Sequence, residues 1–173
     1  MSQPAVLFIC VKNGGKSQMA AALMRQLAGS EIEVHSAGTS PAAQLNTLSV
    51  QVLDEVGAPT AGEAPKPIDP HLLARMDVVV TLGEEAQVDH VPGPRFETWV
   101  TDEPSERGID GIDRMRLVRD DIAARVALLA AELTGFPARA VGGPEALSPE
   151  AAAPYRGISR HEQHPGETEG RST

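Results

Sequence analysis

The chain has 173 residues, of which 41% are hydrophobic and 3% aromatic, and its formal net charge is −9. This length suits one domain with a full core and is too short for two, and a core with so few aromatic rings must rely on Ala, Val, Leu and Ile. The acidic balance argues against a general nucleic-acid binder, because a phosphate backbone is bound by clustered Lys and Arg.

Strand-like and helix-like segments alternate along most of the chain. The apolar run at 4–11 predicts a buried strand of a parallel sheet, and Ser17 is the expected N-cap of a helix that ends at Gly29. The later expected elements are a strand at 31–36, a helix at 45–56, a short helix at 72–76, strands at 77–82 and 96–100, and a helix at 115–133. This alternation predicts an α/β fold, a three-layer sandwich in which a central four-stranded parallel sheet carries helices on both faces.

The composition changes after residue 135. Residues 136–173 contain five Pro and five Gly, few apolar side chains and no sustained periodicity. We therefore expect one folded domain at 1–135 and a flexible tail at 136–173. A short cover over the sheet, anchored by Tyr155, is the alternative interpretation of these residues.

Cysteine content and hydropathy predict a cytoplasmic protein. Cys10 is the only cysteine, so an intramolecular disulfide is impossible, which fits a reducing compartment. The apolar run at 5–10 lacks the basic lead-in and the small-residue cleavage site of a signal peptide. No stretch approaches the ~20 apolar residues of a membrane span, so we expect no association with membranes.

The loop after the first strand has the most informative sequence, Cys10-Val11-Lys12-Asn13-Gly14-Gly15-Lys16-Ser17. A loop between a buried strand and a helix gathers backbone N–H groups in one concavity, and its glycines allow a tight curl. The first helical turn adds unpaired N–H groups and the positive end of the helix dipole. Such a loop binds a phosphate-sized dianion and stabilises the thiolate of Cys10, to which Ser17 can donate a further hydrogen bond. A thiolate beside a bound tetrahedral oxyanion is placed to attack the central atom.

Two other interpretations of this loop are weaker. A lone cysteine in an apolar strand is usually a buried small hydrophobe, but the adjoining Asn, Gly, Lys and Ser residues favour a reactive one. A nucleotide-binding P-loop needs Gly, four residues and then Gly-Lys-Ser. Residues 15–17 match its end, but Cys10 stands where its first Gly is required.

The loop resembles the active-site loop of the low-molecular-weight protein tyrosine phosphatases and of the arsenate reductases that share their fold. That family has Cys, five residues, Arg and then Ser or Thr, with Asn third after Cys, and Cys10, Asn13 and Ser17 match this pattern. Lys16 stands where the family usually has Arg, and a lysine is a point charge without the planar two-pronged fit of a guanidinium. Lys12 is either a compensating charge or a solvated side chain.

The resemblance implies that Cys10 is the nucleophile and that Lys16 and Ser17 assist it. The oxyanion-binding residues that it implies are Val11, Lys12, Asn13, Gly14, Gly15 and Lys16. It implies no metal and no bound cofactor.

The general acid is expected near residue 102. Residues 99–104 resemble the family's acid loop, which is commonly Trp, three residues and then Asp-Pro. Spacing puts Glu103 at the acid position, whereas chemical type favours Asp102. Both stay candidates, with Asp102 preferred.

Three features favour the arsenate reductases over the phosphatases of this family. Gln18 follows Ser17, where phosphatases usually carry Pro. Gly15 stands where phosphatases usually have a second cysteine. Phosphatases also usually carry tyrosines after the acid loop, whereas the sole tyrosine here is Tyr155.

A single cysteine constrains the reductase mechanism. Thioredoxin-coupled members of the family use two further cysteines after the third strand, where this chain has Gly83 and His90. The chain therefore most resembles the single-cysteine arsenate–mycothiol transferases. That resemblance implies a small thiol, mycothiol or glutathione, as co-substrate and a glutaredoxin- or mycoredoxin-type protein as partner. We expect a monomer that binds arsenate or a phosphate-like oxyanion, with a tyrosine phosphatase and a non-catalytic oxyanion- or phosphoprotein-binding module as the alternatives.

Overall fold

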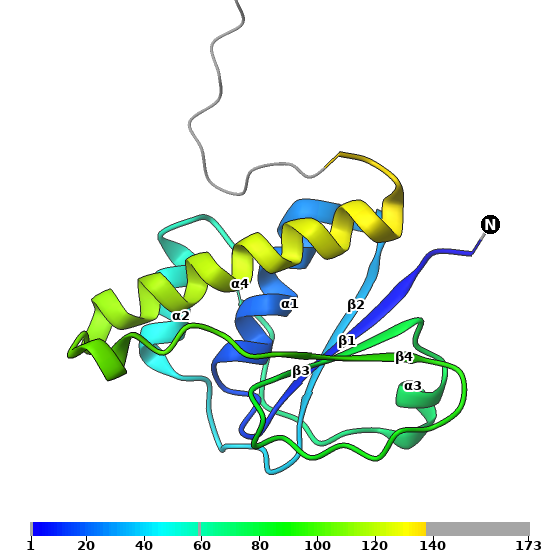
Figure 1. Ribbon diagram of the computed structural model, residues 1–173, viewed down its shortest axis with the longest axis horizontal. Coiled ribbons are helices and arrows are strands. Elements are labelled where there is room, and N and C mark those ends of the chain that lie inside the picture. The colour runs from blue at the N-terminus through cyan, green and yellow to red at the C-terminus, as the bar shows by residue number, and fades with distance from the viewer. Residues whose placement is uncertain (1, 59, 138–173) are drawn as a thin grey trace, which may run out of the picture. The chain divides into compact units, whose positions relative to one another are not determined.

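The computed structural model describes residues 2–58 and 60–137 of the chain (Figure 1). Four strands form one sheet: β1 (Ala5–Cys10), β2 (Glu33–Gly38), β3 (Val78–Leu82) and β4 (Arg95–Trp99). Their order is β2-β1-β3-β4 and every neighbouring pair is parallel, which confirms the predicted four-stranded parallel sheet. Most of the predicted tail, from residue 138 on, lies outside the described residues.

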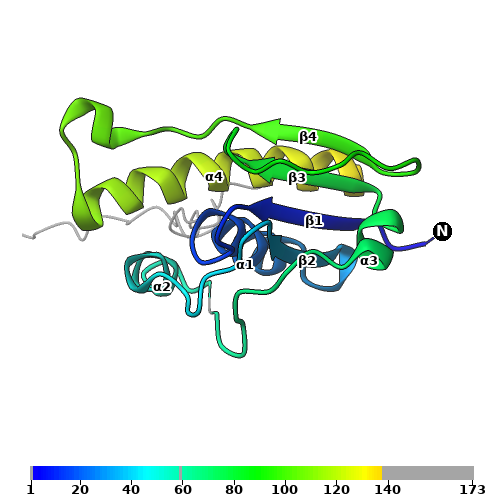
Figure 2. The ribbon, with the colours of Figure 1, turned by 90° about the horizontal axis from the view of Figure 1, so that it is seen from below.

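Helices cover both faces of the sheet, as predicted. They are α1 (Lys16–Ala28), α2 (Thr47–Asp54), α3 (Pro70–Ala74) and α4 (Gly111–Thr134), with short 3₁₀ turns at Gly29–Glu31 and Pro104–Arg107. Side chains of α1, α2 and α4 share one hydrophobic core, whereas Leu73 of α3 belongs to a smaller core on the opposite face. Figure 2 shows α2 and the start of α4 beyond the tips of the strand arrows, so both helices flank the carboxyl end of the sheet.

Strand β1 lies at the centre of the sheet, and all six of its residues are buried. Because strand side chains alternate between faces, Val6, Phe8 and Cys10 join the core under α1 and α4, while Leu7 and Ile9 join the core under α3. Burying a large apolar side chain contributes about 1.5–3 kcal/mol. Because β1 is packed on both faces, the backbone of Cys10 is held in a fixed position at the carboxyl end of the sheet.

The prediction for the start of the first helix was wrong by two residues. The N-cap of α1 is Gly15 and not Ser17, which lies inside the helix and is fully buried. The first helical turn therefore begins within the Cys10 loop. Other boundaries shifted by a few residues: the last helix starts at Gly111 instead of Met115, and the second strand runs from Glu33 to Gly38.

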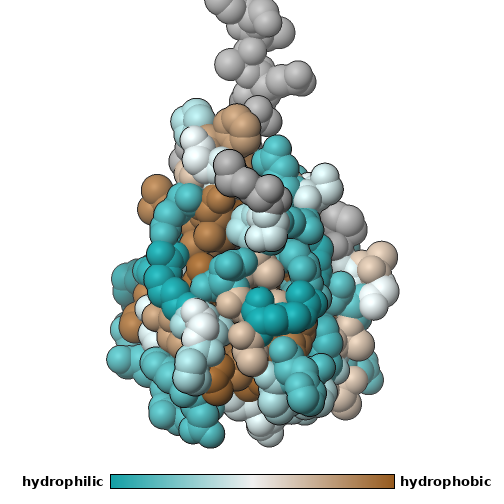
Figure 3. Space-filling view, turned by 90° about the vertical axis from the view of Figure 1, so that its right-hand side faces the viewer, coloured by the Kyte–Doolittle hydropathy of each residue, from teal (hydrophilic) through white to brown (hydrophobic). Residues whose placement is uncertain are grey.

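Hydrophilic residues predominate on the face of the molecule seen in Figure 3, and hydrophobic ones show in smaller areas between them and at the outline. Among the described residues, the large hydrophobic side chains that are exposed are Val100, Leu117, Leu128 and Phe136. No helix of the described part is long and apolar enough to cross a membrane.

Candidate active site

The segment from Cys10 to Lys16 joins β1 to α1 at the carboxyl edge of the sheet. Its shape is held by a second segment, because the N–H groups of Thr39, Ser40, Ala42 and Asn46 donate to loop carbonyls at 2.7–3.1 Å. The accepting carbonyls belong to Cys10, Val11, Lys12 and Gly14. Within the described residues, the N–H groups of Lys12, Gly14 and Gly15 meet no protein acceptor. The predicted oxyanion-binding residues thus form a continuous loop in which the amides of Lys12, Gly14 and Gly15 are available to an anion.

Cys10 lies at the base of this loop and is 8% exposed. The backbone N–H of Asn13 donates to its Sγ at 3.2 Å, and Ser17 Oγ lies 2.9 Å from the same sulfur, where a hydrogen bond was expected. Both contacts stabilise negative charge on sulfur, as does the start of α1. The sequence-predicted nucleophile and its hydroxyl partner are therefore together.

Asn13 organises the loop from its centre. Its side-chain Nδ2 donates to Ser17 Oγ at 2.7 Å, so the single proton of Ser17 is left to point at Cys10. Its Oδ1 accepts from Gln18 Nε2 at 3.3 Å and from the backbone N–H of Lys66 at 3.0 Å. Its φ of 48° is in the left-handed region, which asparagine tolerates better than most residues.

Gly38 ends β2 directly beside the loop. A Cβ atom on Gly38 would lie 2.8 Å from the carbonyl oxygen of Val11 and 2.9 Å from the Cβ of Asn13. A side chain cannot fit there without moving the loop backbone. The lack of a side chain at Gly38 therefore allows the end of β2 to lie close to the backbone of the loop.

Lys16 and Glu103 form an ion pair across the mouth of the loop, and the second carboxylate oxygen of Glu103 accepts from Arg114 Nη2 at 2.8 Å. Burial raises the pKa of Glu103, but the hydrogen bonds from Lys16 and Arg114 outweigh it and the pKa is lowered overall. The carboxylate therefore stays ionised while it bridges the two cations.

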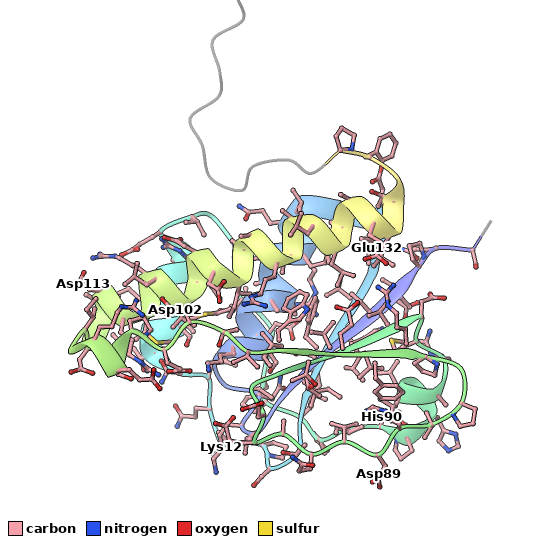
Figure 4. The ribbon with its side chains drawn as sticks, viewed as in Figure 1. Lys12, Asp89, His90, Asp102, Asp113 and Glu132 are labelled. Carbon is pink, nitrogen blue, oxygen red and sulfur yellow. The ribbon has the colours of Figure 1, made fainter. Side chains whose placement is uncertain are left out.

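Asp102 points elsewhere. It accepts two hydrogen bonds from Arg107, at 2.7 and 2.9 Å, which lower its pKa. Its backbone N–H donates to Asp121 of α4 at 2.8 Å, and Figure 4 shows its side chain beside the amino-terminal half of that helix. The structure thus brings Glu103, and not Asp102, into contact with the cysteine loop.

A pocket of about 330 Å³ opens beside the loop. Its lining residues are Lys12, Gly14, Gly15, Lys16, Ala42, Gln44, Asn46, Ser49, Arg114, Met115 and Val118. Lys12 is exposed and, in Figure 4, projects from the edge of the molecule, yet it borders the same pocket as Lys16 and Arg114. Three cations surround this pocket although the whole chain is acidic, so the site attracts anions locally.

Sequence reasoning did not find Arg114, Lys66 or Gly38 as parts of the site. Arg114 is one of several charged residues at the start of a helix, so the sequence does not distinguish it from its neighbours. Lys66 contacts Asn13 through its backbone N–H, which is independent of the residue type. Gln18 had been noted only as a family marker, whereas the structure gives it a contact with Asn13. Groups of His, Cys, Asp and Glu suited to a metal ion are absent from the described part of the chain.

Comparison with known proteins places these observations in context. The sequence model described as low molecular weight phosphotyrosine protein phosphatase matches residues 5–135. An arsenate reductase of Halalkalibacterium halodurans is 32% identical over 138 residues, which are 75% of this chain and 97% of that protein. Among solved structures, a thioredoxin-dependent arsenate reductase of Corynebacterium glutamicum is 34% identical with a TM-score of 0.65, covering 75% of this chain and 61% of that one. An arsenate reductase solved in its phosphate-binding state is 27% identical with a TM-score of 0.64, covering 75% and 98%.

Proposed function

Because the chain belongs to the low-molecular-weight phosphotyrosine protein phosphatase family, we propose that it is an arsenate reductase of that family and that it works by thiol transfer in the cytoplasm. Relatives of 30–32% identity are named arsenate reductases, and a solved structure of 27% identity is that of an arsenate reductase in a phosphate-binding state. A tetrahedral oxyanion is accordingly the proposed substrate.

The observation that carries the proposal is the surroundings of Cys10 Sγ. The sulfur lies 3.2 Å from the donating N–H of Asn13 and 2.9 Å from Ser17 Oγ, at the base of a loop with free amides. These donors favour the thiolate, which is the nucleophilic form. The same amides, with Lys16, would hold the oxygens of arsenate so that sulfur faces arsenic.

In the first step, the Cys10 thiolate attacks arsenic and forms the S–As bond. An As–O bond breaks, and the departing hydroxide takes a proton from the general acid and leaves as water. Arsenic is still As(V) in this Cys10 adduct.

We propose Glu103 as that acid, in place of Asp102, because Glu103 contacts Lys16 of the loop whereas Asp102 is engaged with Arg107. An acid must be protonated, and the contacts of Glu103 with Lys16 and Arg114 hold its pKa low. If the bound oxyanion draws both cations to itself, burial is left as the dominant influence, and burial raises the pKa of Glu103. Oxyanion binding would then prepare the acid.

The second step needs a small thiol, because Cys10 is the sole cysteine of the chain. The thiolate of mycothiol or glutathione attacks arsenic, and the Cys10 thiolate leaves. A thiolate of a glutaredoxin- or mycoredoxin-type protein then attacks the sulfur of the thiol adduct. The electron pair of the S–As bond passes to arsenic, which is released as arsenite, while the two sulfurs form a mixed disulfide.

Two other functions fit parts of the site. The loop would hold phosphate as well as arsenate, so phosphotyrosine or a small phosphoester is an alternative substrate, with a Cys10–phosphate intermediate. Lys16 in place of the usual Arg favours a third possibility, a binding module that holds an oxyanion or a phosphoprotein without turnover.

The test is arsenate-dependent NADPH consumption by the purified protein with mycothiol or glutathione, the matching redoxin and its reductase. We expect consumption that requires arsenate, the small thiol and Cys10, with Cys10→Ser as the inactive control. The absence of consumption with either thiol would refute the proposal. Hydrolysis of p-nitrophenyl phosphate would then indicate a phosphatase, and phosphate binding without hydrolysis would indicate the binding module.

A further inference from the structure

We propose that Arg114 of α4 is a direct contact for the substrate oxyanion and supplies the guanidinium that the loop lacks at Lys16. The inference rests on the proposed function only in taking the Cys10 loop as an oxyanion site. No residue pattern in the sequence marks Arg114, but its place in the fold does.

Arg114 lies in the first turn of α4 and borders the same pocket as Lys12, Gly14 and Lys16. Its Nη2 donates to one oxygen of Glu103 at 2.8 Å, and Lys16 bonds the other oxygen. One carboxylate therefore spans the guanidinium and the ammonium. Two oxygens of a tetrahedral oxyanion form a similar edge, so an oxyanion at the mouth of the loop can be held by the same two cations.

The guanidinium of Arg114 also has unused donors. Its Nε is buried and, within the described residues, has no hydrogen-bond partner, and its Nη1 has only a weak contact with the sulfur of Met115 at 4.0 Å. A buried donor without an acceptor destabilises the fold. By contrast, Arg116 on the same helix bonds both Glu55 and Asp113. Unlike Arg116, Arg114 therefore has donors left with which to bind a further anion.

The chemistry of the two cations is complementary. Lys16 provides a point charge from the loop, whereas Arg114, which lines the same pocket, provides a planar group of donors from α4. Glu103 bonds both cations, so an incoming oxyanion has to compete with it for them. Arg114 would then restore from α4 the two-pronged grip that the family usually has within the loop.

Protection of Cys10 from alkylation tests this directly and needs no turnover. The rate of Cys10 alkylation by iodoacetamide is measured against phosphate and arsenate concentration, and the concentration that halves the rate gives the apparent affinity. We expect Arg114→Gln to weaken the affinity about tenfold to a hundredfold, as for loss of a charged hydrogen bond. Arg116→Gln, which removes the same charge from the same helix, should leave it within about twofold.

Two further variants separate contact with the oxyanion from a role in positioning Glu103. Arg114→Gln should weaken binding in a Glu103→Gln background too, and Lys16→Arg should recover most of the affinity that Arg114→Gln loses. Unchanged affinity in Arg114→Gln, or an effect that vanishes in the Glu103→Gln background, would overturn the inference. Because alkylation reports binding alone, failure of arsenate reduction would leave this result intact, and circular dichroism of each variant checks that it is folded.

Discussion

The surroundings of Cys10 are organised by Asn13, through both its backbone and its side chain. Asn13 combines a left-handed backbone with three side-chain hydrogen bonds, to Ser17, Gln18 and the backbone of Lys66. The backbone conformation directs its N–H to the sulfur, and the side chain fixes the hydroxyl of Ser17. Asn13 therefore sets the shape of the loop and also the hydrogen bonds around the sulfur. Because both roles suit asparagine, this residue could be identified from the sequence pattern alone.

Replacing each acidic candidate with the corresponding amide residue shows which of the two acts as the general acid. Glu103→Gln keeps the shape of the side chain but removes the proposed proton donor, and with it the anion that pairs with Lys16 and Arg114. We expect oxyanion affinity to rise and the turnover number to fall about a hundredfold, within the usual range of general-acid effects. The measurement is kcat beside phosphate protection of Cys10.

Asp102→Asn is the matched control for that experiment. It breaks the pair with Arg107 and leaves the contacts of Glu103 in place, so kcat should change by less than about threefold. A large loss in Asp102→Asn together with full activity in Glu103→Gln would exchange the two roles and support the residue preferred from the sequence.

At the scale of single elements, periodicity predicted the strands and helices and failed mainly at their ends. The wrong N-cap is instructive, because serine is a strong capping residue in isolation. Here the hydroxyl of Ser17 is used by Cys10 and Asn13, and Gly15 takes the cap position. The tertiary contacts of Ser17 therefore outweigh its local preference for the N-cap position, as is expected where function and local propensity compete.

The end of β2 supports the loop through the small size of Gly38. Gly38→Ala adds a methyl group that would meet the Val11 carbonyl and Asn13, both of them backbone-linked and unable to swing away. We expect a loss of about 1–3 kcal/mol in the free energy of unfolding, as for overpacked cores. Urea denaturation measures this loss.

In Gly38→Ala, the rate at which iodoacetamide alkylates Cys10 should also change, because the Asn13 N–H moves with the loop. Gly62→Ala is unsuitable as a control because Gly62 has a positive φ, so Ala61→Gly on the exposed turn serves instead. Normal stability and normal alkylation in Gly38→Ala would contradict the close packing of β2 on the loop.

Strand β2 also predicts a pH effect at its start. Hydrogen bonds from Arg75 and then from His35 lower the pKa of Glu33 from 4.5 to about 2. A carboxylate with a lowered pKa in the folded state stabilises the protein fully above the unfolded value and loses that effect as the pH falls towards the folded value. The stability difference between the native chain and Glu33→Gln should therefore shrink between pH 4.5 and pH 2.

Thermal unfolding of both proteins across that range is the measurement. The effect should be modest, because the carboxylate is only half-buried and salt screens it. If the difference stays constant down to pH 2, the ion pair between Glu33 and Arg75 does not contribute to the stability of the folded protein.

For the whole molecule, the sequence was sufficient to predict the fold, and it also indicated which residues share the cysteine loop. Cys10, Asn13, Lys16 and Ser17 lie in one loop, so their proximity follows from their spacing. The contacts that sequence reasoning missed join distant segments: Lys66 lies 53 residues from Asn13, and Arg114 and Lys16 meet only through Glu103. Such contacts depend on how helices pack at the edge of the sheet, which no local pattern encodes.

The whole chain is expected to be a monomer. Its exposed large hydrophobic residues in the described part are few, and those on α4, Leu117 and Leu128, lie three turns apart. Light scattering on the full chain should give the mass of one copy, 18.2 kDa. A dimer mass at micromolar concentration would contradict this expectation.

Trp99 is the only tryptophan of the chain and is buried at the end of β4, four residues before Glu103. Its ring packs against Phe8, two residues before Cys10 on β1, with ring centroids 5.7 Å apart. The protein therefore contains its own fluorophore. This ring contacts the strand that ends at Cys10 through Phe8, and it lies on the strand that precedes Glu103. Ultraviolet emission from this single indole offers a label-free optical signal by which the proposed oxyanion entry and thiol exchange can be tested on the stopped-flow timescale.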